Sequence, residues 1–232
     1  RGKAIAQAIK NLRTGEILLV AGKGHEKTQD LGARKIFFSD KKVILNAIEK
    51  KNLILSDNLK FNIVKELSMD NKISHKLNLR QAKINSREVK KDDIFFAIKG
   101  RKHDGNKFIV QAFEKNASLA IVNQINKKNN IARQIKVKDS LKFLTESSNI
   151  FRESINTKII AITGSCGKTT LKELLGSSLK KISKVSISPK SYNNKYGVPL
   201  SLFNLDQKDD YGVLEIGMDK KGEIDYLSKI VK

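Results

Sequence analysis

Residues 158–175 read KIIAITGSCGKTTLKELL, and this stretch decides the fold. Its apolar start, residues 158–163, is dense enough to be an interior strand of a parallel sheet. A glycine-containing loop follows over residues 164–170, and residues 171–182 are compatible with a helix. A helix N-terminus exposes unpaired N–H groups and a partial positive charge. The order of strand, loop and helix therefore predicts a phosphate-binding site.

Two side chains of this loop carry the predicted chemistry. Lys168 is expected to reach the β- and γ-phosphates of a nucleoside triphosphate, and Thr169 to hold Mg2+ through its hydroxyl. The loop has the short G-x-x-G-K-T-T form, because Ile162 stands where the common motif has its first glycine. The alternative is an ordinary strand-to-helix turn. The whole loop is predicted to bind the nucleotide: Gly164, Ser165, Cys166, Gly167, Lys168, Thr169 and Thr170.

An acidic residue downstream belongs with this loop. Residues 211–216, YGVLEI, are expected to form another buried strand, in which Glu215 places a carboxylate that is costly to bury unpaired. Glu215 follows Lys168 by 47 residues, which leaves room for a helix, a strand and a second helix. Lys168 and Glu215 are therefore the predicted catalytic residues, and Thr169 and Glu215 the predicted metal ligands. The alternative is a glutamate that protrudes at the sheet edge.

Between these two elements, residues 191–200 read SYNNKYGVPL, with neutral amides ahead of an expected helix. Asn193 and Asn194 supply these amides, and the family resemblance described next implies that they orient a phosphate or an acyl group.

Three motifs in this order resemble the central ATPase domain of the Mur ligase family: GSCGKTT, NNKYGVPLSL and EIGMDKKGEI. The resemblance implies an ATP-dependent amide ligase of peptidoglycan precursor synthesis that uses ATP and Mg2+ in the cytoplasm. ATP would phosphorylate the terminal carboxylate of a UDP-linked peptide, and an amine would attack the resulting acyl phosphate.

Residues 85–122 resemble the N-terminal substrate domain of one branch of this family. The stretch reads NSREVKKDDIFFAIKGRKHDGNKFIVQAFEKNASLAIV. That branch adds D-alanyl-D-alanine to UDP-N-acetylmuramoyl-tripeptide, so both molecules are the implied substrates. The resemblance assigns nucleotide-sugar contacts to Ser86, Arg87 and Asp104. The chain departs from the family at Asn106, where a histidine is usual.

The opening segment resembles a different branch, which adds the third amino acid of the peptide. ILLVAGKGHEKTQ at residues 17–29 and RKIFFSD at residues 34–40 resemble the end of its C-terminal domain. Gly22 and Glu26 would then contact that amino acid; the alternative is a tight polar turn. The chain also lacks an initiator methionine. We therefore expect a fragment across the junction of two fused ligases, inactive by itself.

The predicted fold class is α/β, in three parts. Residues 1–52 are expected to be a fragment of a Rossmann-like C-terminal domain, with a buried strand at 17–21, a strand at 35–38 and a helix from 39. Residues 53–150 are expected to form a small α/β substrate domain, with strands at 84–87, 93–98 and 119–122. Residues 151–232 are expected to be a partial P-loop ATPase domain with a parallel sheet.

Composition limits the remaining function classes. The 232 residues include 46 Lys and Arg against 24 Asp and Glu, a formal charge of +22 that is compatible with nucleic-acid binding. However, 38 of the 46 are scattered lysines, so we expect no nucleic-acid partner. No apolar run is long enough for membrane insertion, and the single Cys166 excludes an internal disulfide. We expect a monomer.

Three alternatives stay open at this point. One is another ligase of the same superfamily, such as folylpolyglutamate synthase. The others are a P-loop NTPase acting on nucleic acid and a noncatalytic basic adaptor.

Overall fold

The computed structural model describes residues 1–12, 16–22, 26, 28–30, 32, 35–55, 59–68, 77–100, 103–128, 131–189, 192–218 and 220–231. The chain divides into two compact units, Arg1–Asp57 and Asn58–Lys232. The division into three domains stays a prediction, and its borders at 52 and 150 lie inside helices α2 (Asp40–Leu55) and α5 (Ser140–Ser154). No helix in the described ranges has both the length and the apolar character needed to cross a membrane.

The first unit is built on a pair of helices. Helix α1 (Gly2–Asn11) packs against α2 and buries Ile5 and Ile9. The Ser39 hydroxyl accepts a hydrogen bond from the backbone N–H of Lys42 and so caps α2. Strands β1 (Thr28–Asp30) and β2 (Lys35–Phe37) pair antiparallel. The predicted strand at 35–38 and the helix that follows it are confirmed.

The predicted buried strand at residues 17–21 is wrong. This segment is irregular, and Ile17 and Leu19 are 94% and 85% exposed. An interior strand needs a hydrogen-bonded neighbour on each side. Within the described part of this unit, β1 and β2 pair only with each other, so the apolar run has no strand to join.

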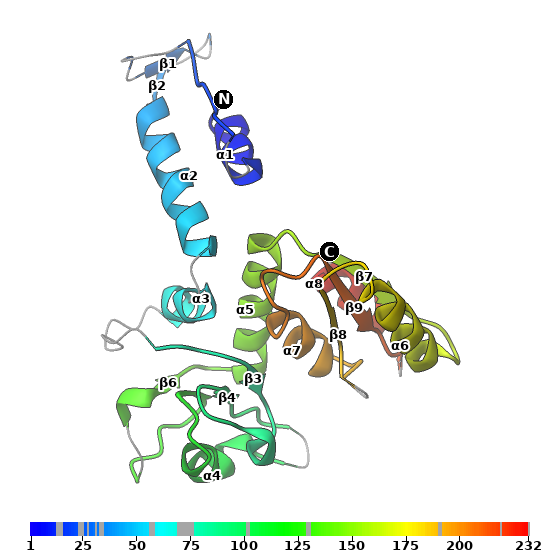
Figure 1. Ribbon diagram of the computed structural model, residues 1–232. Coiled ribbons are helices and arrows are strands. Elements are labelled where there is room, and N and C mark those ends of the chain that lie inside the picture. The colour runs from blue at the N-terminus through cyan, green and yellow to red at the C-terminus, as the bar shows by residue number, and fades with distance from the viewer. Residues whose placement is uncertain are drawn as a thin grey trace. The chain divides into compact units, whose positions relative to one another are not determined.

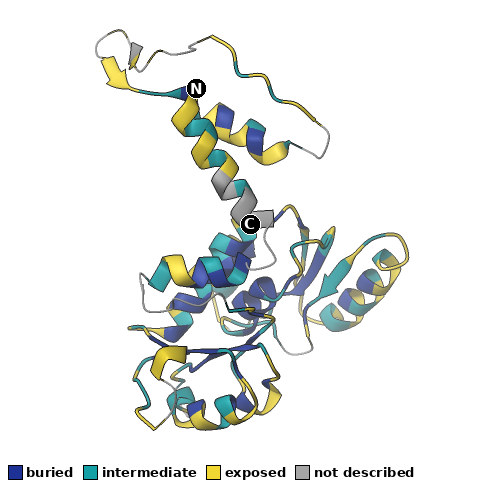
Figure 2. Cartoon of the chain, turned by 60° about the vertical axis from the view of Figure 1, so that its left-hand side comes forward, coloured by how far each residue is buried: buried dark blue, intermediate teal, exposed yellow. Residues whose placement is uncertain are grey.

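The second unit begins its sheet structure with four parallel strands. These are β3 (Ala82–Lys83), β4 (Ile94–Phe96), β5 (Leu119–Val122) and β6 (Gln134–Lys136), hydrogen-bonded in that order. Figure 1 labels β3, β4 and β6 of this sheet. Strands β4 and β5 are buried along their whole length, and the strands of this sheet are largely dark blue in Figure 2. Helix α4 (Ile109–Glu114) packs its Ile109 and Ala112 into the same core. The strands near 94 and 119 were predictable because their apolar runs are continuous.

Two features of this sheet differ from expectation. Residues 84–87 do not form a strand, because the Asn85 side chain accepts a hydrogen bond from the Arg87 N–H and starts the 3-10 helix η1 (Ser86–Glu88). Strand β6 was not predicted, since its sequence, QIK, is short and polar. Its Gln134 is buried, and its amide is satisfied by two hydrogen bonds with the backbone of Asn126, at 2.8 and 2.9 Å.

A second parallel sheet carries the predicted ATPase motifs. It contains β7 (Lys158–Ile162), β8 (Val185–Ile187) and β9 (Tyr211–Glu215) in the order β7-β9-β8. Helices α6 (Lys168–Leu179), α7 (Gly197–Phe203) and α8 (Glu223–Val231) alternate with these strands. The helix, strand and helix expected between Lys168 and Glu215 are confirmed as α6, β8 and α7. The expectation that residues 158–163 form an interior strand is wrong, because β9 is the central strand of the described sheet.

Helix α5 joins the two sheets of this unit. It packs against α7, α3 (Leu59–Ser68) and β4. The Phe203 ring meets the rings of Phe96 and Phe151 edge to face, with centroids 6.2 and 5.6 Å apart. Lys60 of α3 donates to the Arg80 carbonyl at 3.0 Å, and burial lowers its pKa to about 8.

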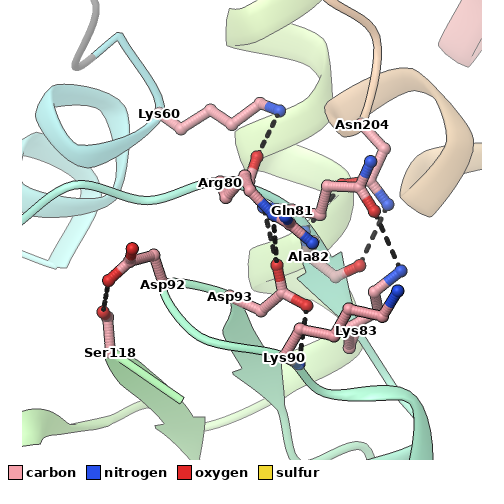
Figure 3. A network of polar contacts seen from close by, with 10 residues as sticks. All are labelled: Lys60, Arg80, Gln81, Ala82, Lys83, Lys90, Asp92, Asp93, Ser118 and Asn204. Carbon is pink, nitrogen blue, oxygen red and sulfur yellow. Dashed lines mark hydrogen bonds and ion pairs between the residues drawn. The ribbon is translucent and has the colours of Figure 1, made fainter. Parts of the chain in front are cut away.

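The same junction holds a polar clamp, seen in Figure 3. The Asn204 side chain accepts from the Ala82 N–H at 2.6 Å and donates to the Ala82 carbonyl at 2.9 Å. One amide at the end of α7 therefore satisfies both backbone groups of a residue in β3. Beside it, the fully buried Asp93 carboxylate accepts from Arg80 and from the N–H groups of Gln81 and Lys90.

We predict that Asn204→Ala lowers the free energy of unfolding of this unit by about 2–3 kcal/mol, because both backbone groups of Ala82 lose their partner. Urea unfolding followed by circular dichroism measures the change. Asn156→Ala, at an exposed asparagine, is the control and is expected to change little. Equal stabilities of the two variants would show that the clamp does not hold the junction.

Candidate functional site

The loop between β7 and α6 is open to solvent. Residues 163–167 are all exposed, and α6 begins immediately afterwards at Lys168. Gly164 and Gly167 have φ angles of +149° and +75°, which residues with a side chain adopt only with strain. Gly167 is also the N-cap of α6 and has no side chain to cap the helix. The N–H groups of the first turn are therefore left for an anionic ligand.

Lys168 lies across this loop. Its ammonium donates a hydrogen bond to the Gly164 carbonyl, four residues earlier in the loop, at 2.7 Å. The neighbouring predicted residues Ser165, Cys166 and Thr170 are exposed, and the Cys166 thiol is free. The loop thus presents a cation and exposed backbone in the arrangement that a polyphosphate requires.

Glu215 is held at the end of β9, only 4% exposed. The Thr169 hydroxyl donates to its Oε2 at 2.8 Å, and the Asn193 amide donates to its Oε1 at 2.9 Å. These contacts bring together residues 46 and 22 positions apart in the sequence. Three predicted residues, Thr169, Asn193 and Glu215, are therefore in direct contact and form the Glu215 cluster, and Lys168 precedes Thr169 at the start of α6.

Burial by itself would raise the pKa of the Glu215 carboxyl. The hydrogen bonds from Asn193 and Thr169 and the positive charges of Lys172 and Lys168 outweigh burial, so the pKa lies below its ordinary value. Glu215 is thus a carboxylate at neutral pH, as a ligand or anchor for a divalent cation must be.

Lys172 is a member of this cluster that sequence reasoning missed. Its side chain is fully buried, and its Nζ lies 3.6 Å from Glu215 Oε2. A signal was available in its spacing, four residues after Lys168 on the same helix face. The apolar neighbours Leu171 and Leu174 were the obvious core positions, yet they are 54% and 64% exposed.

The two asparagines ahead of α7 have different surroundings. The Asn193 carbonyl accepts from the Gly217 N–H at 2.6 Å, so its backbone is tied to the segment after β9. The Asn194 Oδ1 accepts from the N–H groups of Tyr196 and Gly197, both at 3.0 Å, and so starts α7. Asn193 reaches Glu215, whereas the Asn194 side chain shapes the turn.

The predicted sugar-nucleotide residues lie beside the four-stranded sheet. The Ser86 hydroxyl is buried and donates to Gln111 at 2.6 Å, while Arg87 is exposed. Asp104 accepts from the N–H and the amide of Asn106, and these bonds lower its pKa. These residues are linked to the Glu215 cluster through Tyr192, the neighbour of Asn193, whose hydroxyl donates to Glu88 at 3.2 Å.

Gly22 and Glu26 belong to the first unit. Gly22 has a φ of +117° and lies against the Arg1 guanidinium, which donates to the Ala21 carbonyl at 2.9 Å and pairs with Asp40. Glu26 is exposed. Residues 23–25, the centre of the GKGHE motif, lie outside the described residues.

The oxygen atoms of Thr169 and Glu215 suit a magnesium ion whose other ligands are water and phosphate. Within the described ranges, no group of three His, Cys, Asp or Glu side chains could hold a metal. Thr169 and Glu215 supply two oxygen-bearing side chains at the mouth of the phosphate loop. Mg2+ commonly binds in this way, through one or two protein oxygens with water and substrate phosphates.

Two family models match adjoining parts of the chain. Residues 79–161 match the model described as Mur ligase family, catalytic domain, and residues 162–232 match the Mur ligase middle domain. The chain belongs to the Mur ligase family.

Curated relatives carry the name UDP-N-acetylmuramoyl-tripeptide--D-alanyl-D-alanine ligase. The Haemophilus influenzae protein is 36% identical over 161 residues, covering 67% of this chain and 35% of that protein. The Rickettsia prowazekii protein is 36% identical over 160 residues, covering 69% and 35%. The chain spans about a third of the length of these relatives.

Solved structures of Mur ligases resemble this chain. The UDP-N-acetylmuramoylalanyl-D-glutamyl-2,6-diaminopimelate--D-alanyl-D-alanyl ligase of Acinetobacter baumannii matches with a TM-score of 0.63 and 32% identity, over 73% of this chain and 39% of that one. MurF from Thermotoga maritima in complex with ADP matches with a TM-score of 0.55 and 31% identity, over 70% and 36%.

We predict that Thr169→Val raises the pKa of the Glu215 carboxyl, because the carboxylate loses one of its hydrogen-bond donors. Carbon-detected NMR titration of the side-chain carboxyls measures this. Thr170→Val, at the exposed neighbour, is the matched control and should leave the titration unchanged. A Thr169→Val chain that titrates like the control would contradict the described contact.

Proposed function

We propose that the chain forms the substrate domain and part of the ATPase domain of a ligase that adds D-alanyl-D-alanine to UDP-N-acetylmuramoyl-tripeptide. ATP would activate the peptide carboxylate as an acyl phosphate. The observation that carries the proposal is the 2.8 Å hydrogen bond from Thr169, at the start of α6, to the buried Glu215. The names of the relatives that match residues of both sheets support the choice of substrates.

The chain's own residues manage charge in this proposal. The backbone N–H groups at the start of α6 bind phosphate oxygens, and the Lys168 ammonium leaves the Gly164 carbonyl to bind the β- and γ-phosphates. Thr169 and Glu215 would hold Mg2+, which when bound offsets the negative charge on the transferring phosphoryl group. Asn193 keeps the Glu215 carboxylate oriented.

The UDP-sugar site is assigned to the four-stranded sheet. Ser86 and Asp104 follow β3 and β4, which are neighbouring parallel strands. Ligands of parallel sheets bind outside the carboxyl ends of the strands, and Arg87 adds an exposed cation that suits a diphosphate. This arrangement favours a nucleotide-sugar substrate over a folate.

For the first unit we retain the prediction of a contact region for the third amino acid, at Gly22 and Glu26. The positive φ of Gly22 supports a special turn at this position. A fusion of two ligases would account for a second substrate region ahead of the D-alanyl-D-alanine-adding part.

The proposal predicts that Lys168→Ala weakens ATP binding by roughly 10- to 100-fold, the effect of losing a charge-assisted hydrogen bond. Isothermal titration of the full chain with ATP and Mg2+ measures this, and Lys180→Ala, at an exposed lysine after the same helix, is the control. The fold is expected to persist in both variants.

Substrate preference is tested separately by equilibrium binding. UDP-N-acetylmuramoyl-tripeptide is expected to bind, whereas a folate and duplex DNA at high salt are not. ATP binding unaffected by Lys168→Ala would remove the assigned site, and preference for folate or DNA would replace the substrate.

A further inference from the structure

Lys172 is a fully buried lysine. None of its side chain is exposed, and within the described part of the chain its Nζ has no hydrogen-bond partner. A lysine ammonium can donate three hydrogen bonds, so its burial costs free energy that the fold does not recover through them. The residue therefore calls for an explanation other than packing.

Two carboxylates lie near this ammonium. Glu215 Oε2 is 3.6 Å away and Glu173 Oε1 is 3.7 Å away. The Glu173 side chain is 46% exposed, so water screens its charge, whereas the Glu215 side chain is 5% exposed. Glu215 is consequently the main electrostatic partner of Lys172.

The contact converges on one oxygen atom. Glu215 Oε2 accepts a hydrogen bond from Thr169 Oγ1 at 2.8 Å and lies 3.6 Å from Lys172 Nζ. Glu215 Oε1 accepts a hydrogen bond from the Asn193 amide. Thr169 and Lys172 are three residues apart in α6 and so project from neighbouring positions on one face. The hydroxyl of Thr169 has a single proton, and donating it to Glu215 leaves the lone pairs of Oγ1 free for a cation.

A purely structural role explains this arrangement poorly. Buried ion pairs contribute little net stability unless their remaining donors are hydrogen-bonded. Among the residues that the structure describes, none accepts a hydrogen bond from Lys172 Nζ. A methionine would fill similar space without the desolvation cost. Groups retained against stability in this way tend to serve function.

We propose that Lys172 is a positioning residue for the magnesium nucleotide, an inference that rests on the proposed function. The charge of Lys172 holds the Glu215 carboxylate in place. The Thr169 hydroxyl then donates its proton to Glu215 and presents its oxygen to the phosphate loop. Lys172 itself touches neither the nucleotide nor the metal. Its effect is therefore confined to the part of nucleotide affinity that depends on Mg2+.

The test compares ATP affinity with Mg2+ and with EDTA, by titration of the full chain. In Lys172→Met, the tightening of ATP binding by Mg2+ is expected to fall by about tenfold, typical for loss of a group that orients a metal ligand. Affinity in EDTA is expected to stay within about twofold of the unsubstituted chain, because Lys172 makes no direct contact. Lys172→Arg should restore part of the Mg2+ effect.

Glu173→Gln is the matched control, since it removes the other nearby carboxylate and is expected to leave both affinities unchanged. Equal losses in Mg2+ and EDTA, an unchanged Mg2+ effect in Lys172→Met, or an equal effect of Glu173→Gln would each overturn the inference. So would failure of both Lys172 variants to unfold cooperatively, which would make the residue structural. If the unsubstituted chain bound ATP with no Mg2+ effect, the proposed function would fail and the inference with it.

Discussion

A buried carboxylate organises this part of the protein. Removing the charge of Glu215 from water is unfavourable unless other groups compensate, and three groups from outside its own strand do so. Thr169 and Lys172 come from α6, and Asn193 comes from the segment that leads into α7. Compensating the Glu215 charge therefore fixes the positions of the phosphate loop, of α6 and of the segment before α7 relative to β9. The exposed loop at residues 163–167 is therefore followed by a helix whose position is fixed by its contacts with Glu215.

The segment that leads into α7 also connects the two sheets of the second unit. Tyr192, the neighbour of Asn193, donates to Glu88 beside the predicted sugar-nucleotide residues. At a separate point of the junction, Asn204 clamps Ala82, and Phe203 packs between Phe96 and Phe151. The proposed ligase activity would require a substrate carboxylate to reach a nucleotide held elsewhere, and positioning of the reacting groups accounts for a large part of catalysis. Direct polar contacts between the two sheets are consistent with that requirement.

Much of the fold could be predicted from sequence where local signals agreed. The strand, glycine loop and helix at residues 158–179 combine apolar pattern and turn chemistry, and the spacing of Glu215 then implies a return to the same sheet. The prediction failed at residues 17–21, where an apolar run was present but no strand in the described part of the unit pairs with it. It failed at residues 84–87, where a side chain of Asn85 competes for the backbone. Gln134 and Lys172 were missed because each is polar and buried: Gln134 is satisfied by the backbone of Asn126 across a loop, and Lys172 faces Glu215, 43 residues later in the chain.

A crystal structure of the chain with Mg2+ and a nonhydrolysable ATP analogue would show whether Glu215 and Thr169 organise the nucleotide site. We expect a divalent ion about 2.1 Å from Thr169 Oγ1, with the terminal phosphate within reach of Lys168 and the Glu215 carboxylate still facing Thr169. A nucleotide bound away from residues 164–170, or an ion that does not contact Thr169, would contradict this expectation.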